Sequence, residues 1–575
     1  MSAVEFNFEI RSKDIAARIG RLEINKKELE TPALIPVYNP NKPTIPVRDL
    51  RRKFNARILM VNSYIILRNE KLRERVLDLG IHRYLGFNGL IATDSGSYQL
   101  MNYGSVSTTN REIIEFQEKI GSEIGAFLDI PSLPNAYKPR ALEQLELTLR
   151  RSKEAKDANF VVNAGIQGST YLDLRRMAAR KIGRHFKLCA IGGIVRLMEE
   201  YRFNNLVDII ATVKKNLPLD RVVHAFGLGH PMVFSLAAAL GCDLFDSAAY
   251  ALYADDLRYM TVNGTKRLDN LEYLPCSCPV CSKYGIELKE LEEGEKIRNL
   301  AMHNLYVSLE ELNRVKQAIK EGNLWELLSI RARSHPELLT GLARLRKYGR
   351  WLSELDPITK KSPLYYLGGE SRYRPEVITA RGRIKRVSST NRVRIPPFGK
   401  VPIEILDIYP FGSFRVTESL IREEPCFNVR EMEKIKRIME YQFGSNASEL
   451  IEKDFRIKKS RRTGRIRGIY RGSELIASVR ASDHFVIPKS YLADKLKKKF
   501  RYPRLRVVVD DDAVPFVSRG RSVFAKFVVD IDLELRANDE VLVVDRRDNL
   551  IGIGTLVLSP REVMDFDRGV AVRIR

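Results

Sequence analysis

The residues of this chain best suited to chemistry begin with three closely spaced cysteines, Cys276, Cys278 and Cys281. Soft thiolates and one imidazole nitrogen are the ligand set of a tetrahedral zinc site. His303 follows in a helical pattern and is the expected fourth ligand, with His224 and His230 as alternatives by residue type. Buried thiols without a metal are the plainer interpretation. Because a site with four protein ligands holds structure and activates no water, catalysis is expected elsewhere.

Two aspartates that follow apolar runs are the expected catalytic residues. Asp94 lies in TDSGSYQ and Asp246 in LFDS. The glycine and serines after Asp94 allow a flat ligand to approach the backbone closely. Two such carboxylates allow one to attack an electrophilic carbon while the other moves protons, as in retaining glycosidic chemistry. Paired acids also bind metals in hydrolases, but few histidines lie near these two.

The elements that must position these acids repeat one pattern over residues 1–330, a short apolar run followed by an amphipathic helical stretch. The runs lack a polar face, as parallel strands covered on both sides do. About eight such units predict an α/β fold, a TIM (β/α)8 barrel, with a doubly wound sheet as the alternative. The expected strands are Ala33–Val37, Ile58–Val61, Leu90–Thr93, Ala126–Asp129, Phe160–Ala164, Leu188–Ile191, Val222–Phe226 and Asp243–Phe245.

Polar residues or glycines follow five of these strands. In a barrel all the strand ends meet at one rim, which is where barrel active sites form. Any one of these residues could instead be a helix N-cap, but capping does not explain all five. They are Asp94, Asp129, Gln167, the pair Gly192–Gly193, and Asp246.

Length and charge set the broad class of the chain. With 575 residues it exceeds one hydrophobic core, so two to four domains are expected. Its net charge of +25 favours a polyanionic partner, nucleic acid before an anionic membrane. The charge-rich surface of a heat-adapted protein is the alternative. The sequence has neither an apolar signal segment nor a membrane-length apolar run, and we expect a cytoplasmic protein.

After residue 330 the pattern changes to basic helical runs separated by Pro- and Gly-rich loops. Residues 456–471 and 495–506 combine basic side chains with aromatic ones, which suits phosphate contacts and base stacking, although such runs are more often solvated faces. From about residue 507 short strands predict a small β-barrel. The expected RNA-binding residues of the basic segments are Arg461, Arg462, Arg465, Arg467, Lys497 and Lys498.

Taken together and in order, the motifs TDSGSYQ, GIQG, AIGGI, FGLGHP, LFDSAAYALYA and CSCPVC resemble the tRNA-guanine transglycosylase family, and most of all its archaeal branch in archaeosine biosynthesis. The last segment resembles a PUA domain, an RNA-binding β-barrel, and adds Arg519, Arg521 and Lys526 to the expected RNA contacts. The resemblance covers essentially the whole chain. It implies a catalytic barrel with the zinc site over residues 1–344, α+β domains over 345–430 and 431–505, and the PUA domain over 506–575.

The resemblance also assigns roles to single residues. Asp246 matches the carboxylate that attacks C1′ of the target nucleoside, and Asp94 matches the general base for the incoming base. The sequence does not decide which of the two attacks. The residues that match the base-binding pocket are Ser95, Tyr98, Asp129, Gln167, Gly193, Ile194, Val195 and His230.

For the activity, the resemblance implies exchange of guanine 15 in the D-arm of tRNA for 7-cyano-7-deazaguanine (preQ0) through a covalent aspartyl–ribose intermediate. It further implies one structural Zn²⁺ per subunit, a homodimer, and contacts to the acceptor end of the tRNA. The alternatives are a queuine-type family member, a related protein that modifies the inserted base, and a non-catalytic tRNA-binding protein. Both aspartates in their motifs favour the exchange reaction.

Overall fold

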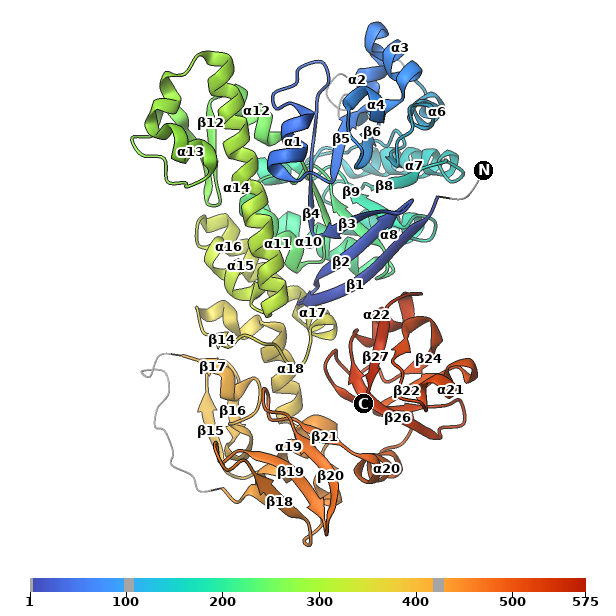
Figure 1. The fold of residues 1–575 in the computed structure, drawn as a ribbon, viewed down its shortest axis with the longest axis vertical. Helices are drawn as coiled ribbons and strands as arrows, with labels where there is room; N and C mark the ends of the chain where they lie inside the picture. The colour runs from blue at the N-terminus through green and yellow to red at the C-terminus, as the bar shows by residue number, and fades with distance from the viewer. Residues whose placement is uncertain (1–3, 98–107, 417–428) are drawn as a thin grey trace. The chain divides into compact units, whose positions relative to one another are not determined.

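The computed structural model describes residues 4–97, 108–416 and 429–575, and it consists of two compact units (Figure 1). The first unit is formed by residues 1–12, 17–320 and 327–344. The second is formed by residues 345–575 with the two short segments 13–16 and 321–326.

Eight parallel strands form the centre of the first unit, in the order β4-β11-β10-β9-β8-β7-β6-β5. A parallel bridge between Val37 and Met60 brings the end of β4 to β5, so the sheet nearly closes. This confirms the predicted TIM barrel. The strands are β4 (Ala33–Pro36), β5 (Ile58–Asn62), β6 (Leu90–Asp94), β7 (Ile124–Gly125), β8 (Val161–Ile166), β9 (Leu188–Ile191), β10 (Val222–Ala225) and β11 (Leu244–Ser247).

The helices between the strands begin and end where local side chains satisfy the backbone. At α6 (Asn110–Ile120), Thr109 accepts from the backbone N–H of Glu112 while the Glu112 carboxylate accepts from the N–H of Thr109. Gly121 ends the helix in the left-handed conformation, with φ of 82°. The other main helices of the barrel are α7 (Lys138–Glu154), α8 (Leu172–Gly183), α10 (Phe203–Asn216) and α11 (Phe234–Ala239).

One expected strand is wrong in its position. The strand predicted at Ala126–Asp129 covers only Ile124–Gly125, and the residues after it are not paired with a neighbouring strand. Side chains satisfy this backbone where a neighbouring strand would otherwise do so. The Gln117 amide donates to the C=O of Ala126 and accepts from its N–H, and Asn110 accepts from the N–H of Leu128. Buried backbone groups need partners, and here helices supply them.

A small subdomain follows the last barrel strand (Figure 1). It consists of α12 (Ala249–Asp255), a hairpin of β12 (Arg258–Thr261) and β13 (Gly264–Arg267), α13 (Pro279–Tyr284) and the long helix α14 (Glu293–Glu321). A three-stranded antiparallel sheet, β1 (Phe6–Asp14), β2 (Ala17–Ile24) and β3 (Lys27–Thr31), precedes the barrel in the chain.

The described residues of the second unit contain two larger sheets, two two-stranded pairs (β14 with β17, Leu364–Tyr365 and Phe414–Arg415; β15 with β16, Arg392–Ile395 and Gly399–Pro402) and several helices. Its four-stranded sheet has the order β18-β19-β20-β21 (Arg456–Lys459, Ile466–Arg471, Glu474–Val479, Val486–Pro488), and α20 (Ser490–Lys499) follows it. The chain ends in a six-stranded sheet of order β23-β27-β26-β25-β22-β24. Its strands are β22 (Arg506–Val509), β23 (Val523–Phe524), β24 (Val528–Ile531), β25 (Glu540–Val544), β26 (Leu550–Leu556) and β27 (Val570–Ile574). Helices α17 (Gly349–Leu355), α18 (Pro375–Ile384) and α19 (Glu431–Phe443) complete the main elements.

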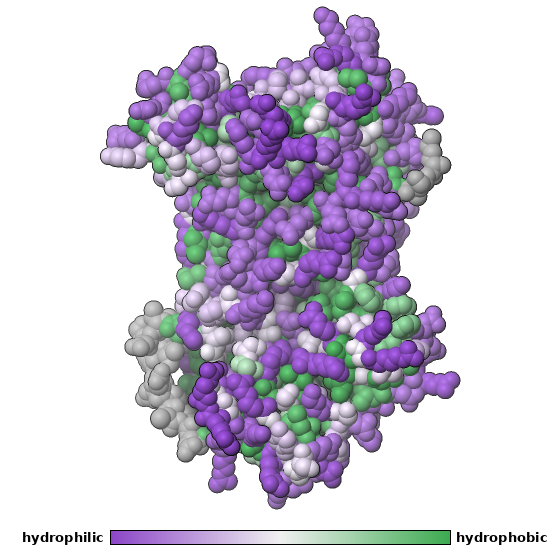
Figure 2. Space-filling model, in the orientation of Figure 1, coloured by the Kyte–Doolittle hydropathy of each residue, from purple (hydrophilic) through white to green (hydrophobic). Residues whose placement is uncertain are grey.

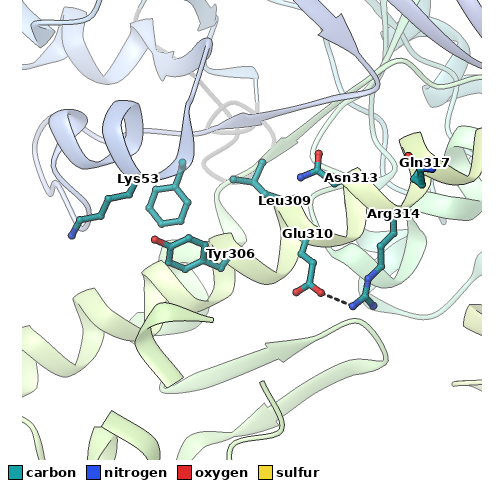
Figure 3. Close-up of a pocket in the computed structure, with 8 residues that line it drawn as sticks. Lys53, Tyr306, Leu309, Glu310, Asn313, Arg314 and Gln317 are labelled. Atoms are coloured by element: carbon teal, nitrogen blue, oxygen red, sulfur yellow. Dashed lines mark hydrogen bonds and ion pairs between the residues drawn. The ribbon is translucent and has the colours of Figure 1, made fainter. Parts of the chain in front are cut away.

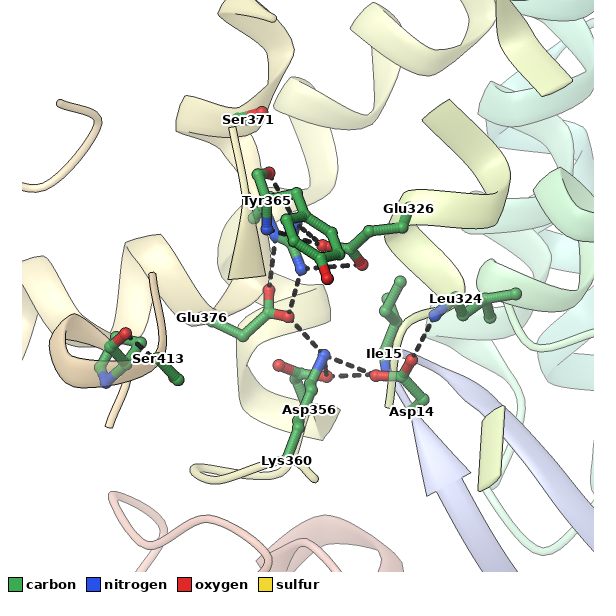
Figure 4. A network of polar contacts seen from close by, with 12 residues as sticks. Asp14, Ile15, Leu324, Glu326, Asp356, Lys360, Tyr365, Ser371, Glu376 and Ser413 are labelled. Atoms are coloured by element: carbon green, nitrogen blue, oxygen red, sulfur yellow. Dashed lines mark hydrogen bonds and ion pairs between the residues drawn. The ribbon is translucent and has the colours of Figure 1, made fainter. Parts of the chain in front are cut away.

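A buried ion network lies inside the second unit (Figure 4). The Lys360 ammonium lies within 2.9 Å of three carboxylates, those of Asp14, Asp356 and Glu376. Arg374 joins Glu376 at 3.0 Å and Glu326 at 2.5 Å. Burial opposes the charged amine, but the three carboxylates outweigh it and hold the pKa of Lys360 well above its usual value. The network ties residues 13–16 and 321–326 to the rest of this unit.

The exposed surface is largely hydrophilic on the face drawn in Figure 2, with scattered apolar areas. Exposed apolar side chains of the C-terminal segment include Phe516, Phe524, Leu533 and Met564. In the described parts of the chain, no helix has both the length and the apolar character needed to cross a membrane.

Candidate active site and metal centre

Three carboxylates from three strand ends meet at one rim of the barrel. Asp94 is the last residue of β6, Asp129 follows β7, and Asp246 lies on β11. Burial raises the pKa of Asp94 to about 7, and the nearby charges of Asp129 and, more weakly, Asp246 add to this shift. The carboxyl ends of the strands therefore gather these acids as the sequence predicts.

Asp94 is fixed by β5 and by the residues that follow it. The Asn62 side-chain amide donates to Asp94 Oδ2 at 2.9 Å, and the Ser63 hydroxyl donates to the Asp94 carbonyl at 2.7 Å. Backbone N–H groups of Ser95 and Gly96 oppose the upward pKa shift without cancelling it. A carboxyl with this pKa carries its proton part of the time near neutrality, which suits a group that both gives and takes a proton.

Asp246 is held differently. It is buried, with 5% of its surface exposed, and its Oδ1 accepts from His224 Nε2 at 2.9 Å and from the Gly227 N–H at 2.5 Å. His224 is itself completely buried, and its Nδ1 lies 2.9 Å from the Asn163 side-chain amide. The other oxygen, Oδ2, makes no hydrogen bond to a described residue.

Asp129 and Gln167 form a pair suited to reading a flat polar ligand. Gln167 Nε2 donates to Asp129 Oδ2 at 2.6 Å, and Gln167 Oε1 is buried without a partner among the described residues. Burial raises the pKa of Asp129, while bonds from Ser97 and Gln167 oppose that shift. Two glycines make room for the pair, because a Cβ on Gly165 would lie 2.4 Å from Asp129 Oδ2 and one on Gly192 would lie 2.1 Å from Gln167 Nε2.

The residues after Gly192 lie beside Gln167 of the Asp129–Gln167 pair and beside Gly227, whose N–H donates to Asp246. Gly193 has φ of 67°, and a Cβ built on it would lie 3.1 Å from Gln167 Oε1. Ile194 is completely buried, so its side chain belongs to the core. Val195 lies against Gly227, the residue whose N–H bonds Asp246.

The remaining predicted base-binding residues differ in what holds them. Ser95 is buried and its hydroxyl bonds that of Ser97 at 2.9 Å. Both ring nitrogens of His230 are occupied, one by the Met232 N–H and the other by the Thr265 hydroxyl, and burial lowers its pKa to about 4. Tyr98 lies outside the described residues.

The predicted metal ligands come together in the subdomain after the barrel. The Sγ atoms of Cys276, Cys278 and Cys281 and a ring nitrogen of His303 lie within 4.8 Å of one another. His303 Nδ1 is 3.5 Å from Cys278 Sγ and 3.3 Å from Cys281 Sγ. Ligands on one tetrahedral zinc ion would lie about 3.5 Å apart at these N–S edges.

The ring orientation of His303 also fits a metal. Its Nε2 bonds the Met260 carbonyl at 3.0 Å, which leaves the Nδ1 lone pair for the thiolate side. Tyr259 stacks on the ring with centroids 3.7 Å apart and lies 3.3 Å from Cys281 Sγ. The cluster can therefore hold a metal ion and is consistent with a zinc site.

The predicted RNA-binding residues all lie in the second unit and differ in exposure. Arg461, Arg462 and Arg465 are exposed in the turn between β18 and β19, and they form no ion pair with the described residues. Lys498 on α20 is exposed but pairs with Asp494 at 3.1 Å. Arg467 and Lys497 are half-buried, whereas Arg519, Arg521 and Lys526 are exposed near β23.

A shallow pocket of about 600 Å³ lies between α1 (Val47–Phe54) and α14, and its lining residue Tyr306 follows His303 by one turn of α14 (Figure 3). Phe54 and Tyr306 contact each other in its lining with ring centroids 4.4 Å apart, and Glu310 pairs with Arg314 there. None of the predicted site residues lines it.

Four residues that position the site were not predicted in that role from the sequence. Asn62 ends β5 in the same way that Asp94 ends β6, so the rule of polar strand ends could have identified it. Asn163 and His224 are polar residues inside apolar strand runs, which is a second readable signal. Arg175 carries no such signal. It is completely buried on α8 and donates to the carbonyls of Ile166, Ser169 and Gly192.

The comparisons with known proteins agree with this geometry. Residues 13–337 match the family model described as queuine tRNA-ribosyltransferase. Residues 433–503 match the patch-forming domain C2 of tRNA-guanine transglycosylase, and residues 505–575 match the PUA domain.

Similar proteins cover the full chain. The tRNA-guanine(15) transglycosylase of Thermococcus onnurineus is 48% identical over 100% of this chain and 99% of its own. That of Pyrococcus abyssi is 48% identical over 99% of this chain, and that of Methanocaldococcus jannaschii is 41% identical over 99%. The chain therefore belongs to the tRNA-guanine transglycosylase family of transferases and carries the C2 and PUA domains after its barrel.

Proposed function

We propose that this chain exchanges guanine 15 of tRNA for 7-cyano-7-deazaguanine through a covalent bond between Asp246 and the ribose. The observation that carries the proposal is the meeting of Asp94, Asp129 and Asp246 at one rim, each held by different partners. The full-length relatives named tRNA-guanine(15) transglycosylase support the same position in tRNA.

The base leaves the tRNA stack and enters the rim, as enzymes that act on a nucleobase require. Asp129 accepts from the N1–H and the amino group of the base, and Gln167 serves the carbonyl beside them. Before the base binds, Gln167 Nε2 donates to Asp129 Oδ2, an acceptor that the base would use. Ser95, Tyr98, Gly193, Ile194, Val195 and His230 belong to the proposed pocket around the base, Ile194 and His230 through packing.

The exchange proceeds in two balanced steps. Asp246 Oδ2 forms a bond to C1′ as the C1′–N9 bond breaks, and the departing electron pair on N9 takes the proton from Asp94. The incoming base then gives its N9 proton back to Asp94, and N9 attacks C1′ and releases the Asp246 carboxylate. A pKa of about 7 for Asp94 supports both directions of this proton transfer at neutral pH.

The cysteine cluster serves as a structural zinc site in this proposal. Three thiolates and His303 Nδ1 would fill all four positions of one Zn²⁺ per subunit, so no position is open for substrate. With the metal bound, Cys276, Cys278 and Cys281 would be linked through it to His303, and so α13 and the loop before it would be held against α14.

The remaining parts of the chain bind tRNA. We assign residues 345–430 and 431–505 to two α+β domains and residues 506–575 to the PUA domain, with the barrel and metal subdomain in 1–344. The exposed turn with Arg461, Arg462 and Arg465 contacts backbone phosphates. The PUA surface near Arg519, Arg521 and Lys526 binds another part of the tRNA, for which we propose the acceptor end. We expect the protein to act in the cytoplasm as a homodimer.

The test uses unmodified tRNA that carries radiolabelled guanine at position 15. Addition of 7-cyano-7-deazaguanine with the protein should release the label, and a denaturing gel should trap a protein–tRNA adduct. Full retention of the label, with binding of tRNA intact, would overturn the proposal. A protein that modifies the inserted base instead would leave the guanine label in place and act only on tRNA that already contains the 7-deazaguanine.

A further inference from the structure

A buried histidine that the sequence reasoning considered only as a metal ligand contacts the proposed nucleophile. His224 lies in β10 and is completely buried. Its register partner on β9 is Ala190, whose partner on β8 is Gly165. A line of polar side chains runs from Asn163 through His224 to Asp246.

The hydrogen bonds in this line make His224 Nε2 a donor to Asp246. Asp246 Oδ1 accepts from the Gly227 N–H and lies 2.9 Å from His224 Nε2, so Nε2 carries a proton and donates. Asn163 Nδ2 lies 2.9 Å from His224 Nδ1, on the side of the ring away from Asp246, and Asn163 Oδ1 is buried without a hydrogen-bond partner among the described residues.

We propose that His224, oriented by Asn163, is a positioning residue for the nucleophile: it holds Asp246 Oδ1 together with Gly227 and leaves Oδ2 to attack C1′. This inference rests on the proposed function, in which Asp246 forms the covalent bond. The two donors converge on one oxygen, while the other makes no hydrogen bond to a described residue. The carboxylate therefore cannot rotate freely, and its attacking atom is chosen in advance.

A neutral donor suits both states of the carboxylate. When Oδ2 bonds to C1′, Oδ1 becomes the carbonyl oxygen of the ester and Asp246 loses its negative charge. A charged imidazolium would then be buried without a counter-ion, which is costly. A neutral N–H can donate to the carboxylate before the reaction and to the ester carbonyl after it. Asparagine stands behind the ring where serine hydrolases place an aspartate, so no carboxylate on that side favours a charged imidazole.

The experiment compares His224→Leu with His224→Gln in the full-length protein. Gln can place an amide N–H near the position of Nε2, whereas Leu keeps bulk and removes the donor. The readouts are the single-turnover rate of adduct formation with unmodified tRNA, the Kd for tRNA, and the melting temperature. We expect His224→Leu to slow adduct formation on the order of 100-fold with the Kd changed by less than about threefold, and His224→Gln to recover to within about tenfold of the unaltered chain.

A second variant keeps the test decisive if His224→Leu does not fold. Asn163→Asp would accept from Nδ1–H and favour the charged imidazole, so we expect slower adduct formation by about tenfold. Unchanged rates in His224→Leu or, if that variant is unfolded, in Asn163→Asp overturn the inference. Equal losses in His224→Leu and His224→Gln also overturn it, because the role would then be packing alone. If the unaltered chain forms no adduct, the proposed function fails, and the inference fails with it.

Discussion

The ends of β6 and β11 carry the same side chain in contrasting surroundings. Asp94 on β6 is partly exposed, lies beside other carboxylates, and has its pKa raised to about 7 by burial and by the charges of Asp129 and Asp246. Asp246 on β11 is buried and accepts two N–H bonds on one oxygen. One environment suits a group that exchanges a proton near neutrality, and the other suits an oriented acceptor.

This difference teaches that role follows environment more than residue type. The sequence offers two aspartates at two strand ends and does not rank them. The structure separates them by their donors: an amide from Asn62 serves Asp94, whereas a histidine and a backbone N–H serve Asp246. Pairs of acids whose surroundings differ in this way are a recurring arrangement for acid–base and nucleophilic chemistry.

The largest effect is expected from Asp246→Asn. An amide cannot form the ester, so no adduct should appear on a denaturing gel and exchange should fall by at least about 10⁴-fold. Asp94→Asn is the matched control, since it changes the same atoms at the other strand end. If Asp246→Asn still forms the adduct and Asp94→Asn does not, the two roles are reversed.

Asp94→Asn itself should reduce exchange by about 10³-fold, because the variant neither gives nor takes the proton. In the unaltered chain, adduct formation needs protonated Asp94 and should slow as pH rises through about 7. Breakdown of the adduct by added base needs ionised Asp94 and should accelerate over the same range. Single-turnover rates at several pH values measure both steps, and a shared direction of the two profiles would contradict this assignment.

The same carboxyl should affect stability. The pKa of Asp94 is higher in the folded chain than its value of 3.8 for an unperturbed aspartate, so ionisation costs folding free energy. The contribution of protonated Asp94 to the free energy of unfolding is complete below pH 3.8. It is lost as pH rises through about 7, where the folded chain must ionise this carboxyl. The gain in melting temperature of Asp94→Asn over the unaltered chain should therefore be larger at about pH 8 than at about pH 5.

Asp129→Asn connects the two sides of the comparison. Loss of the charged acceptor should raise the KM for the incoming base by about 30-fold, which corresponds to about 2 kcal/mol. Because the Asp129 charge helps to raise the pKa of Asp94, its removal should also move the pH profile of adduct formation to lower pH. A raised KM with an unmoved pH profile would show that Asp129 reads the base without acting on Asp94.

The reach of the sequence can be judged from particular elements. The strand predicted at Leu188–Ile191 has these bounds in the structure, because an apolar run is a local signal. The strand predicted at Ala126–Asp129 fails because Gln117 and Asn110 satisfy that backbone from a helix. The apolar pattern of the sequence does not indicate that side chains of a helix, and not a neighbouring strand, bond this backbone.

The candidate site shows the same limit. The rim acids, Gln167 and the four metal-cluster residues were visible as motifs, since each follows a strand or belongs to a short spacing pattern. The support behind them was not. Whether His224 faces Asp246, or Asp14 faces Lys360, depends on the register of strands and on segments hundreds of residues apart. Those pairings exist only after the chain has folded.

Removal of the metal should leave the reaction at Asp94 and Asp246 largely unchanged. Cys278→Ala should lose the metal and lower the melting temperature, while the rate of adduct formation per folded molecule changes by less than about fivefold, because a closed site contributes no chemistry. Cys189→Ala is the control, since this buried thiol lies outside the cluster. A loss of adduct formation as large as that of Asp94→Asn would give the metal a direct part in the reaction.

The smallest effect per residue is expected at the basic turn of the second unit. Replacement of Arg461, Arg462 and Arg465 by alanine should lower kcat/KM for tRNA about threefold for each arginine that binds a phosphate. The slope of log Kd against log salt should decrease by about 1 for each such arginine. Lys498→Ala is the contrast, because the charge of Lys498 is already offset by Asp494 at 3.1 Å and its removal should change the slope less.

These arginine variants also test whether tRNA binding and the two strand ends act separately. Phosphate-binding side chains hold the tRNA before and after the covalent step. Their replacement should therefore reduce the fraction of protein with bound tRNA without moving the pH at which Asp94 titrates. At saturating tRNA the single-turnover rate should match that of the unaltered chain, since only the fraction bound has changed. A reduced rate at saturation would mean that the basic turn also orients the flipped nucleoside over Asp246, and the division between gripping the tRNA and performing the chemistry would then fail.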